Sequence, residues 1–232
     1  MARRMYDLAG EDPGRRFSPY CWRIRMALAH KGLAVETIPW RFSDKAAVEF
    51  SGQGLVPVLV DEDGTVVSDS FRIAEYLEDR YPDRPSLFGG AGGRAAARFI
   101  ANWTEFVLHA GIARSVVRDI LDVIQPADRA YFRQSREARF GMTLEQVVAG
   151  RDAGLAAFQK EMHPLRLTLR TQPFLGGQAA DFSDYIVLGA FQWARCVSPF
   201  RLLAPDDPVY AWRGRMLGLF DGLAGKSLGY EV

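Results

Sequence analysis

The spacing of apolar residues divides the chain into two parts with different predicted secondary structure. In the first eighty residues, short apolar runs typical of strands alternate with helical patterns, whereas from residue 94 onward apolar residues recur only at helical spacing. This change predicts an α/β domain over residues 1–81 and an all-helical domain over residues 94–232. Residues 82–93, PDRPSLFGGAGG, are rich in Pro and Gly and are predicted to link the two.

The first part is predicted to have the element order βαβαββα. The patterns predict strands at 5–9, 35–39, 56–61 and 66–70, helices at 19–31 and 70–81, and a short helix at 46–50. Asp63-Gly64, between the last two strands, is typical of a hairpin turn. Gly32 follows the first long helix as a C-terminal cap.

The second part is predicted to be a helical bundle. Two sets of residues show the helical spacing: Phe99, Trp103, Phe106 and Ala110, and Ile186, Gly189, Ala190 and Trp193. TLEQ (143–146) predicts a capping box, and Pro164 is expected to bend or break the helix that follows. DFSD (181–184) places a capping oxygen before an apolar helix that ends at Ser198-Pro199.

Composition excludes several classes of protein. With 48% hydrophobic and 25% charged residues, the chain is expected to be a soluble globular protein rather than a disordered one. Its 29 basic and 28 acidic residues are interspersed, which argues against a nucleic-acid-binding surface. The sequence has no apolar leader or membrane-length run and only two cysteines, so we expect a cytoplasmic location. The three histidines lack metal-like spacing, and we expect no metal.

Three short segments carry candidate chemistry. In SPYC (18–21), Ser18 precedes a proline at the start of a helix, as if the first sulfur of a redox Cys-x-x-Cys had been replaced by oxygen. Val56-Pro57 opens a strand, where a cis bond is one solution although trans is commoner. Asp69-Ser70 heads a helix, where its side chains could cap amides or leave them for a ligand carboxylate. Taken singly, each segment also fits a purely structural role.

Taken together, these segments and the βαβαββα order resemble the glutathione S-transferase superfamily, in which a thioredoxin-like domain with a mixed sheet precedes an all-α bundle domain. The resemblance covers essentially the whole chain, and DFSD looks like the family's N-capping signal. Within the superfamily, TLEQVVAGRD (143–152) and FLGGQAADFSDYIVLGAFQWA (174–194) look most like the bacterial lignin β-etherase-related branch. SPYCWR (18–23) is also similar to the zeta class, which includes maleylacetoacetate isomerases.

The resemblance implies a binding site for glutathione as cosubstrate. The expected site residues are Phe17, Ser18, Leu55, Val56, Pro57, Asp69 and Ser70. In the family, the proline matching Pro57 is cis, the backbone matching Val56 meets the cysteinyl part of glutathione, and the pair matching Asp69-Ser70 holds its γ-glutamyl end. Leu55 departs from the Lys or Gln of many relatives, which leaves the partner of the glycyl carboxylate open between Arg41 and Gln53.

Ser18 is the expected catalytic residue. A thiol of pKa near 8.5 is only about 3% ionised at pH 7, and only the thiolate attacks carbon. A helix N-terminus contributes about 0.3–1 kcal/mol to its ionisation, and a hydrogen bond to a charged acceptor about 1.5–3 kcal/mol. Ser18 is therefore predicted to hold glutathione as a thiolate through its hydroxyl, although a plain helix cap is the alternative. Cys21 has no local sulfur partner and is predicted to be a packing residue.

The electrophilic substrate is expected to bind where the helical domain faces Ser18. Tyr20, Trp103, Phe106 and Trp193 are the candidate pocket residues, since they could stack an aryl group, although interdomain packing would use the same side chains. The resemblance implies a homodimeric glutathione transferase, with β-aryl ether cleavage as one specific reaction. A maleylacetoacetate-type isomerase, a thiol-disulfide reductase and a non-catalytic ligand-binding or interaction module are the alternatives.

Overall fold

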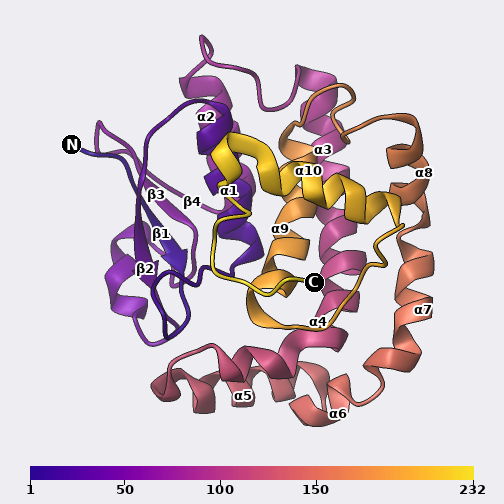
Figure 1. The fold of residues 1–232 in the computed structure, drawn as a ribbon. Coiled ribbons are helices and arrows are strands. Elements are labelled where there is room, and N and C mark those ends of the chain that lie inside the picture. The colour runs from indigo at the N-terminus through magenta and orange to yellow at the C-terminus, as the bar shows by residue number, and fades with distance from the viewer.

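The computed structural model describes residues 1–232, and its N-terminal part contains a four-stranded mixed sheet (Figure 1). Strands β1 (Arg4–Leu8), β2 (Glu36–Trp40), β3 (Val58–Val60) and β4 (Val66–Ser68) lie in the order β2-β1-β3-β4. Strand β1 is parallel to β2 and antiparallel to β3, which is antiparallel to β4. Helices α1 (Pro19–His30) and α2 (Ser70–Arg80) and the 3-10 helix η1 (Lys45–Ser51) complete this part. The predicted βαβαββα order is confirmed.

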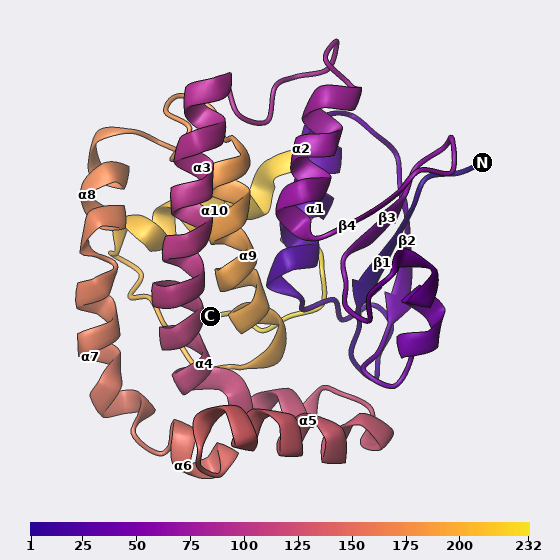
Figure 2. The ribbon, with the colours of Figure 1, turned by 180° about the vertical axis from the view of Figure 1, so that it is seen from behind.

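The C-terminal part is helical, as predicted (Figure 2). Its elements are α3 (Ala91–Trp103), the π-helical segment η2 (Thr104–His109), α4 (Ala110–Val116), the 3-10 helix η3 (Val117–Asp122), α5 (Pro126–Phe140), α6 (Leu144–Val148), α7 (Arg151–Glu161), α8 (His163–Thr171), α9 (Phe182–Val197) and α10 (Pro208–Gly222). Because α3 begins at residue 91, the last glycines of the predicted connector form its first turn. Pro164 lies in the first turn of α8, just after the break that separates this helix from α7.

Helix α9 is the central element of the helical part. Fourteen of its side chains are buried, and it packs against α1 on one side and α3 on the other (Figure 2). The capping oxygen predicted at its start is present and forms part of a capping box: Asp181 accepts a hydrogen bond from the backbone of Ser183, and Asp184 reaches back to the amide of Asp181. Buried Asp184 also accepts from the indole of Trp212 at 2.8 Å, which ties α9 to α10. The predicted capping box of Thr143 with Gln146 is also present.

The apolar face predicted for the first bundle helix is wrong in two positions. Phe99 is 69% exposed and Phe106 is 80% exposed, although they fall at helical spacing with Trp103. Of the α3 side chains, Ala97 is the buried one. The chain changes to π-helical winding at Thr104, and the wider turn rotates the residues that follow relative to those of α3.

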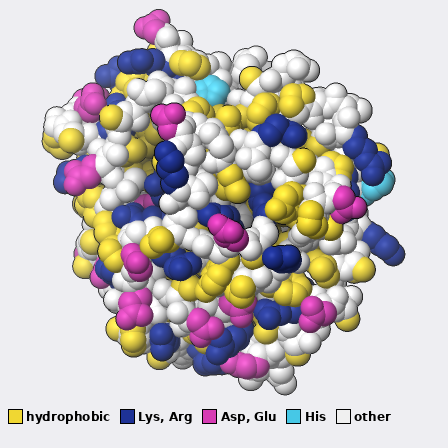
Figure 3. Space-filling view, in the orientation of Figure 1, with side chains coloured by type: hydrophobic (Ala, Val, Ile, Leu, Met, Phe, Trp, Pro, Cys, Tyr) yellow, Lys and Arg dark blue, Asp and Glu magenta, His cyan; other side chains and the backbone are white.

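Helix α5 connects the helical part to the sheet part at the lower end of the molecule in Figure 1. The amide of Phe42, just after β2, donates to buried Asp128 at 3.2 Å. The Phe42 ring packs against Tyr131 and Phe132, with centroid distances of 6.1 and 5.6 Å. On the face shown in Figure 3, basic and acidic side chains are interspersed rather than gathered by sign.

Candidate functional site

The sheet register brings the predicted motifs to one end of the sheet. Val58 pairs with Tyr6 of β1 on one side and with Ser68 of β4 on the other. Pro57 directly precedes Val58, and Asp69 directly follows β4, so both lie near the end of the sheet at which β1 finishes. The chain leaves β1 at this end and leads to Ser18 at the start of α1.

Ser18 caps the first helix of the chain. Its Oγ accepts a hydrogen bond from the amide of Cys21 at 3.2 Å, and Pro19 occupies the first helical turn. The residue is only 3% exposed, and the segment before it is fixed by the Trp22 indole, which donates to the carbonyl of Arg16 at 2.8 Å. In this bond the Ser18 hydroxyl is the acceptor, and a hydroxyl has one proton to donate as well. The side chain therefore places a hydroxyl group at a helix N-terminus.

The peptide bond between Val56 and Pro57 is cis, as the resemblance implied. Val56 is half-buried, and neither its N–H nor its C=O is hydrogen-bonded within the chain. Backbone groups of this kind need a partner, which an extended peptide-like ligand or water supplies. Val56 is therefore suited to the backbone contact predicted for it.

Asp69 has an unusual backbone conformation at the start of α2. Its φ is +73°, which is rare for a residue other than glycine, and its Oδ1 accepts from the amides of Phe71 and Arg72 at 3.0 Å each. The cap predicted for Asp69 is present, and Ser70 beside it is 3% exposed. Conformations of this kind cluster at ligand-binding sites, where the surrounding structure holds them.

Two predicted site residues, Phe17 and Leu55, lie in very different surroundings. The side chain of Phe17 is 2% exposed and packs in the core, so that only its backbone is placed to meet a ligand. Leu55 is 69% exposed, and its backbone is held by both ends of the Gln53 amide. The Arg41 guanidinium donates to the carbonyls of Gly10 and Glu11. Arg41 and Gln53, the two open candidates for binding the glycyl carboxylate, thus both make hydrogen bonds within the chain.

The structure joins two of the predicted pocket residues through a residue that the sequence analysis did not select. The His109 ring meets Tyr20 edge-on at 5.4 Å and Trp193 at 5.8 Å, measured between ring centroids. The Tyr20 hydroxyl donates to Glu105 at 2.5 Å. Glu105 and His109 are four residues apart on η2, a spacing that could have drawn attention to them. Trp103, the last residue of α3, is half-buried and packs against the hydrophobic core.

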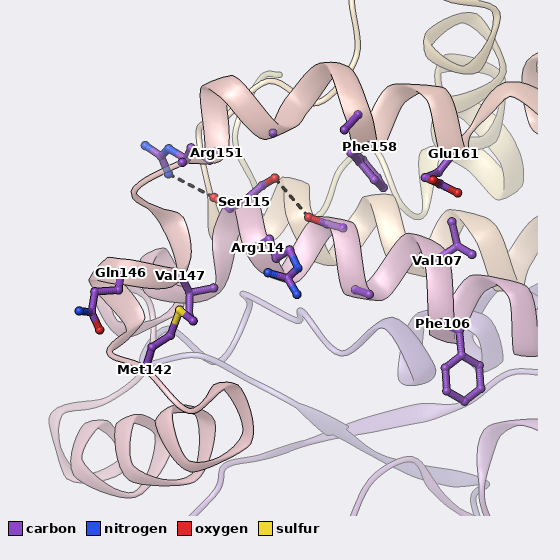
Figure 4. Close-up of a pocket in the computed structure, with 15 residues that line it drawn as sticks. Phe106, Val107, Arg114, Ser115, Met142, Gln146, Val147, Arg151, Phe158 and Glu161 are labelled. Atoms are coloured by element: carbon purple, nitrogen blue, oxygen red, sulfur yellow. Dashed lines mark hydrogen bonds between the residues drawn. The ribbon is translucent and has the colours of Figure 1, made fainter.

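Phe106 instead lines a separate hollow of about 540 Å³ on the helical part (Figure 4). The hollow lies between the segment containing η2 and α4 on one side and α7 on the other, and Val107, Arg114 and Phe158 also line it. None of the predicted glutathione-site residues lines it.

Cys21 is completely buried, in agreement with the packing role predicted for it. Burial raises the pKa of the Cys21 thiol well above its ordinary value, and the nearby carboxyl of Asp7 raises it further. A thiol in this environment is a poor nucleophile, since only the thiolate reacts.

The structure contains neither a cluster of metal-binding side chains nor a membrane-spanning helix. No group of three or more His, Cys, Asp or Glu side chains is arranged to hold a metal ion. No helix is both long and apolar enough to span a membrane.

Comparison with known proteins identifies the family. Residues 17–80 match the family model for the glutathione S-transferase N-terminal domain, and residues 95–201 match the model for the C-terminal domain. A zeta-class glutathione S-transferase of Euphorbia esula is 30% identical over 156 residues, 65% of this chain and 68% of that protein. The maleylacetoacetate isomerase of Pseudomonas aeruginosa is 34% identical over 87 residues, 34% of this chain and 41% of that protein. The matches to two zeta-class proteins of Arabidopsis thaliana span only 31% of the relatives' length.

Solved structures of the same fold cover nearly the whole chain. Glutathione transferase GSTFuA3 of Phanerochaete chrysosporium has a TM-score of 0.77 and 25% identity, over 96% of this chain and 92% of that one. A glutathione S-transferase of Ceriporiopsis subvermispora, in complex with glutathione, has a TM-score of 0.79 and 23% identity, over 95% and 98%.

The fold shared with these structures is a thioredoxin-like part with a four-stranded mixed sheet, followed by a helical part built around an N-capped helix. The chain belongs to the glutathione S-transferase family. The predicted fold and family are confirmed.

Proposed function

We propose that the protein is a glutathione transferase in which Ser18 holds the glutathione thiolate for attack on an electrophilic, aromatic substrate. The carrying observation is the position of the Ser18 hydroxyl at the start of α1, at the end of the sheet where Val56-Pro57 and Asp69 also lie. A hydroxyl donor and the helix amides both favour an anion at this place.

The reaction follows from the polarity of the site. The thiol proton passes to solvent, the sulfur lone pair forms a bond to the electrophilic carbon, and the bond from that carbon to its leaving group breaks. The leaving group departs with the electron pair. The Val56 backbone would meet the cysteinyl part of glutathione, and the start of α2 at Asp69 and Ser70 would meet its γ-glutamyl end, with Phe17 and Leu55 at the borders of the site. The enzyme contributes orientation and charge stabilisation.

A β-aryl ether is the specific substrate that we favour, since displacement of a phenolate by a thiolate uses the same parts. The resemblance of residues 174–194 to the β-etherase-related branch supports this choice. A glutathione-dependent isomerase of the maleylacetoacetate type is the second candidate, supported by the match to the Pseudomonas aeruginosa enzyme. A non-catalytic ligand-binding or interaction module is the third.

We further propose a cytoplasmic homodimer. Two exposed aromatic side chains, Phe99 and Phe106, project from the segment of α3 and η2, and a second copy of this chain would cover them. Both cysteines are free thiols, which fits a reducing compartment.

The proposed function is tested by glutathione conjugation to 1-chloro-2,4-dinitrobenzene. We expect activity in the wild type and a loss of about tenfold or more in kcat/KM for Ser18→Ala, because the charge-assisted hydrogen bond is removed. Ser115→Ala, which deletes another buried hydroxyl that donates to a carbonyl within α4, is the control. Glutathione-resin retention without conjugation of any electrophile would support the non-catalytic module instead.

A further inference from the structure

A hydrogen-bonded network crosses the border between the two parts of the molecule beside Ser18. The Tyr20 hydroxyl, on the first turn of α1, donates to Glu105 Oε2 at 2.5 Å. The same oxygen lies 3.0 Å from His109 Nδ1, and since an ionised carboxylate only accepts, His109 is the donor. Glu105 and His109 both belong to the π-helical segment η2. Turns of π-helix occur frequently at functional sites.

These donors keep the carboxylate charged. The hydrogen bond from His109, together with that from Tyr20, lowers the pKa of Glu105 to about 2 although burial opposes the shift. Burial lowers the pKa of His109, and the hydrogen bond to Glu105 opposes that shift. His109 Nε2 is buried and has no partner.

Two cations face the network, and neither pairs with the carboxylate. Arg23 is 4% exposed, with its guanidinium carbon 4.7 Å from the centroid of the Tyr20 ring, and two of its nitrogens have no partner. Arg23 is therefore almost inaccessible to solvent. Arg139, an exposed residue of α5, acts on Tyr20 and His109 only through its charge.

One carboxylate oxygen remains open. The Glu105 side chain is 36% exposed, and its Oε1 takes no hydrogen bond from the protein, whereas Oε2 takes two. The aromatic rings of Tyr20 and Trp193 stand on either side of His109 in the same network. A partly exposed carboxylate with one open oxygen thus lies beside aromatic rings. One of these rings belongs to Tyr20, which follows Ser18 by two residues in the chain.

We propose that Glu105 Oε1 is a specificity-determining contact for the electrophile, selecting aryl substrates that present a hydroxyl donor over aryl substrates that present a carboxylate. A hydroxyl would donate to Oε1, while a second carboxylate at this place would meet an anion that cannot give a proton. The inference rests on the proposed function, because it concerns the second substrate of the Ser18 site. It favours a hydroxylated aryl substrate over the carboxylate substrate of a maleylacetoacetate-type isomerase.

The test uses glutathione with three benzyl chlorides that differ only at the para position: hydroxymethyl, methyl and carboxylate. After division by the uncatalysed rates, we expect kcat/KM of the wild type to fall in that order. The first and last should differ by about tenfold or more, the size of one charge-assisted hydrogen bond. Glu105→Gln, which keeps an acceptor for Tyr20, should reduce the difference to within about threefold, mainly through KM.

Two further variants separate charge from structure. Glu105→Asp keeps the charge and should retain the order of the three substrates. Glu36→Gln removes the same charge at an exposed position at the start of β2 and should leave the selectivity unchanged. A wild type that conjugates all three compounds equally, or a Glu105→Gln variant that keeps the full preference, would overturn this inference alone. A wild type inactive on all three but active on 1-chloro-2,4-dinitrobenzene would likewise overturn this inference alone, and one inactive on all four compounds would overturn the proposed function together with it.

Discussion

Ser18 and Cys21 differ in what surrounds their polar atoms, although they share the first turn of one helix. The Ser18 hydroxyl accepts from the Cys21 amide and is proposed to donate its proton to a ligand, whereas the Cys21 sulfur lies in the core. The replacement of sulfur by oxygen at position 18 therefore leaves a donor in place of a nucleophile. In the proposed reaction the nucleophilic sulfur belongs to glutathione.

The two cysteines provide a first prediction. Burial raises the pKa of Cys21 well above its ordinary value and raises the pKa of Cys196 to about 12. We expect neither thiol of the native protein to react with iodoacetamide at pH 8, and both to react in denaturant. Peptide mass spectrometry measures the modification. Native labelling of Cys21 would show that its environment is not the one described.

The dependence of the free energy of unfolding on pH, at acid pH, tests whether Glu105 is ionised in the folded protein. Its pKa falls from 4.5 to about 2 on folding, so the unfolded state binds the proton first and the carboxylate stabilises the fold above pH 4.5. This contribution is lost as the pH falls from 4.5 to about 2. The free energy of unfolding of Glu105→Gln, measured in urea at several pH values, should therefore decline less steeply than that of the wild type over this range. Parallel curves would argue that Glu105 is not held as an anion.

Helices α1 and α9 are in close contact at a glycine, Gly189. A Cβ at Gly189 would lie 2.3 Å from the carbonyl oxygen of Pro19, a backbone atom that cannot rotate away. Gly189→Ala should therefore displace the start of α1, destabilise the protein by about 1–3 kcal/mol and lower conjugation activity. Gly154→Ala is the matched control, since its Cβ meets nothing within 4 Å. Urea unfolding of both variants measures the difference, and equal stabilities would refute the close contact.

Local patterns predicted the elements well where each element carried its own signal. The capping boxes at Thr143 and Asp181 and the hairpin at Asp63-Gly64 are determined by neighbours in the sequence. The π-helical segment was missed, because no local signal marks a turn that tertiary packing stabilises. For that reason Phe106 was assigned to the substrate pocket but lines a different hollow.

At the scale of the whole molecule, the network beside Ser18 depends on contacts between distant segments. Tyr20 and Glu105 are separated by 85 residues and belong to different parts of the fold. The sequence indicated Tyr20 as a neighbour of Ser18, but the partner of its hydroxyl depends on how α1 packs beside η2. Motifs therefore sufficed to propose the glutathione side of the site, whereas the proposal for the substrate side required the assembled structure.

The proposed dimer gives a prediction at the same scale. The proposed dimer would cover the exposed side chains of Phe99 and Phe106, so we expect light scattering to give the mass of two chains for the wild type. The double substitution Phe99→Glu with Phe106→Glu should shift this mass toward that of one chain. Leu228→Glu, at another exposed apolar position, should not. A monomeric wild type would exclude the proposed assembly.

The most direct test of the account is the ionisation of glutathione bound to the protein, followed by the ultraviolet absorbance of the thiolate as pH is varied. With Ser18 donating to the sulfur, the pKa of the bound thiol should lie about two units below that of free glutathione. Ser18→Ala should raise it by about one to two units, since a charge-assisted hydrogen bond contributes about 1.5–3 kcal/mol. An unchanged pKa in Ser18→Ala, with glutathione still bound, would contradict the central claim that this hydroxyl holds the thiolate.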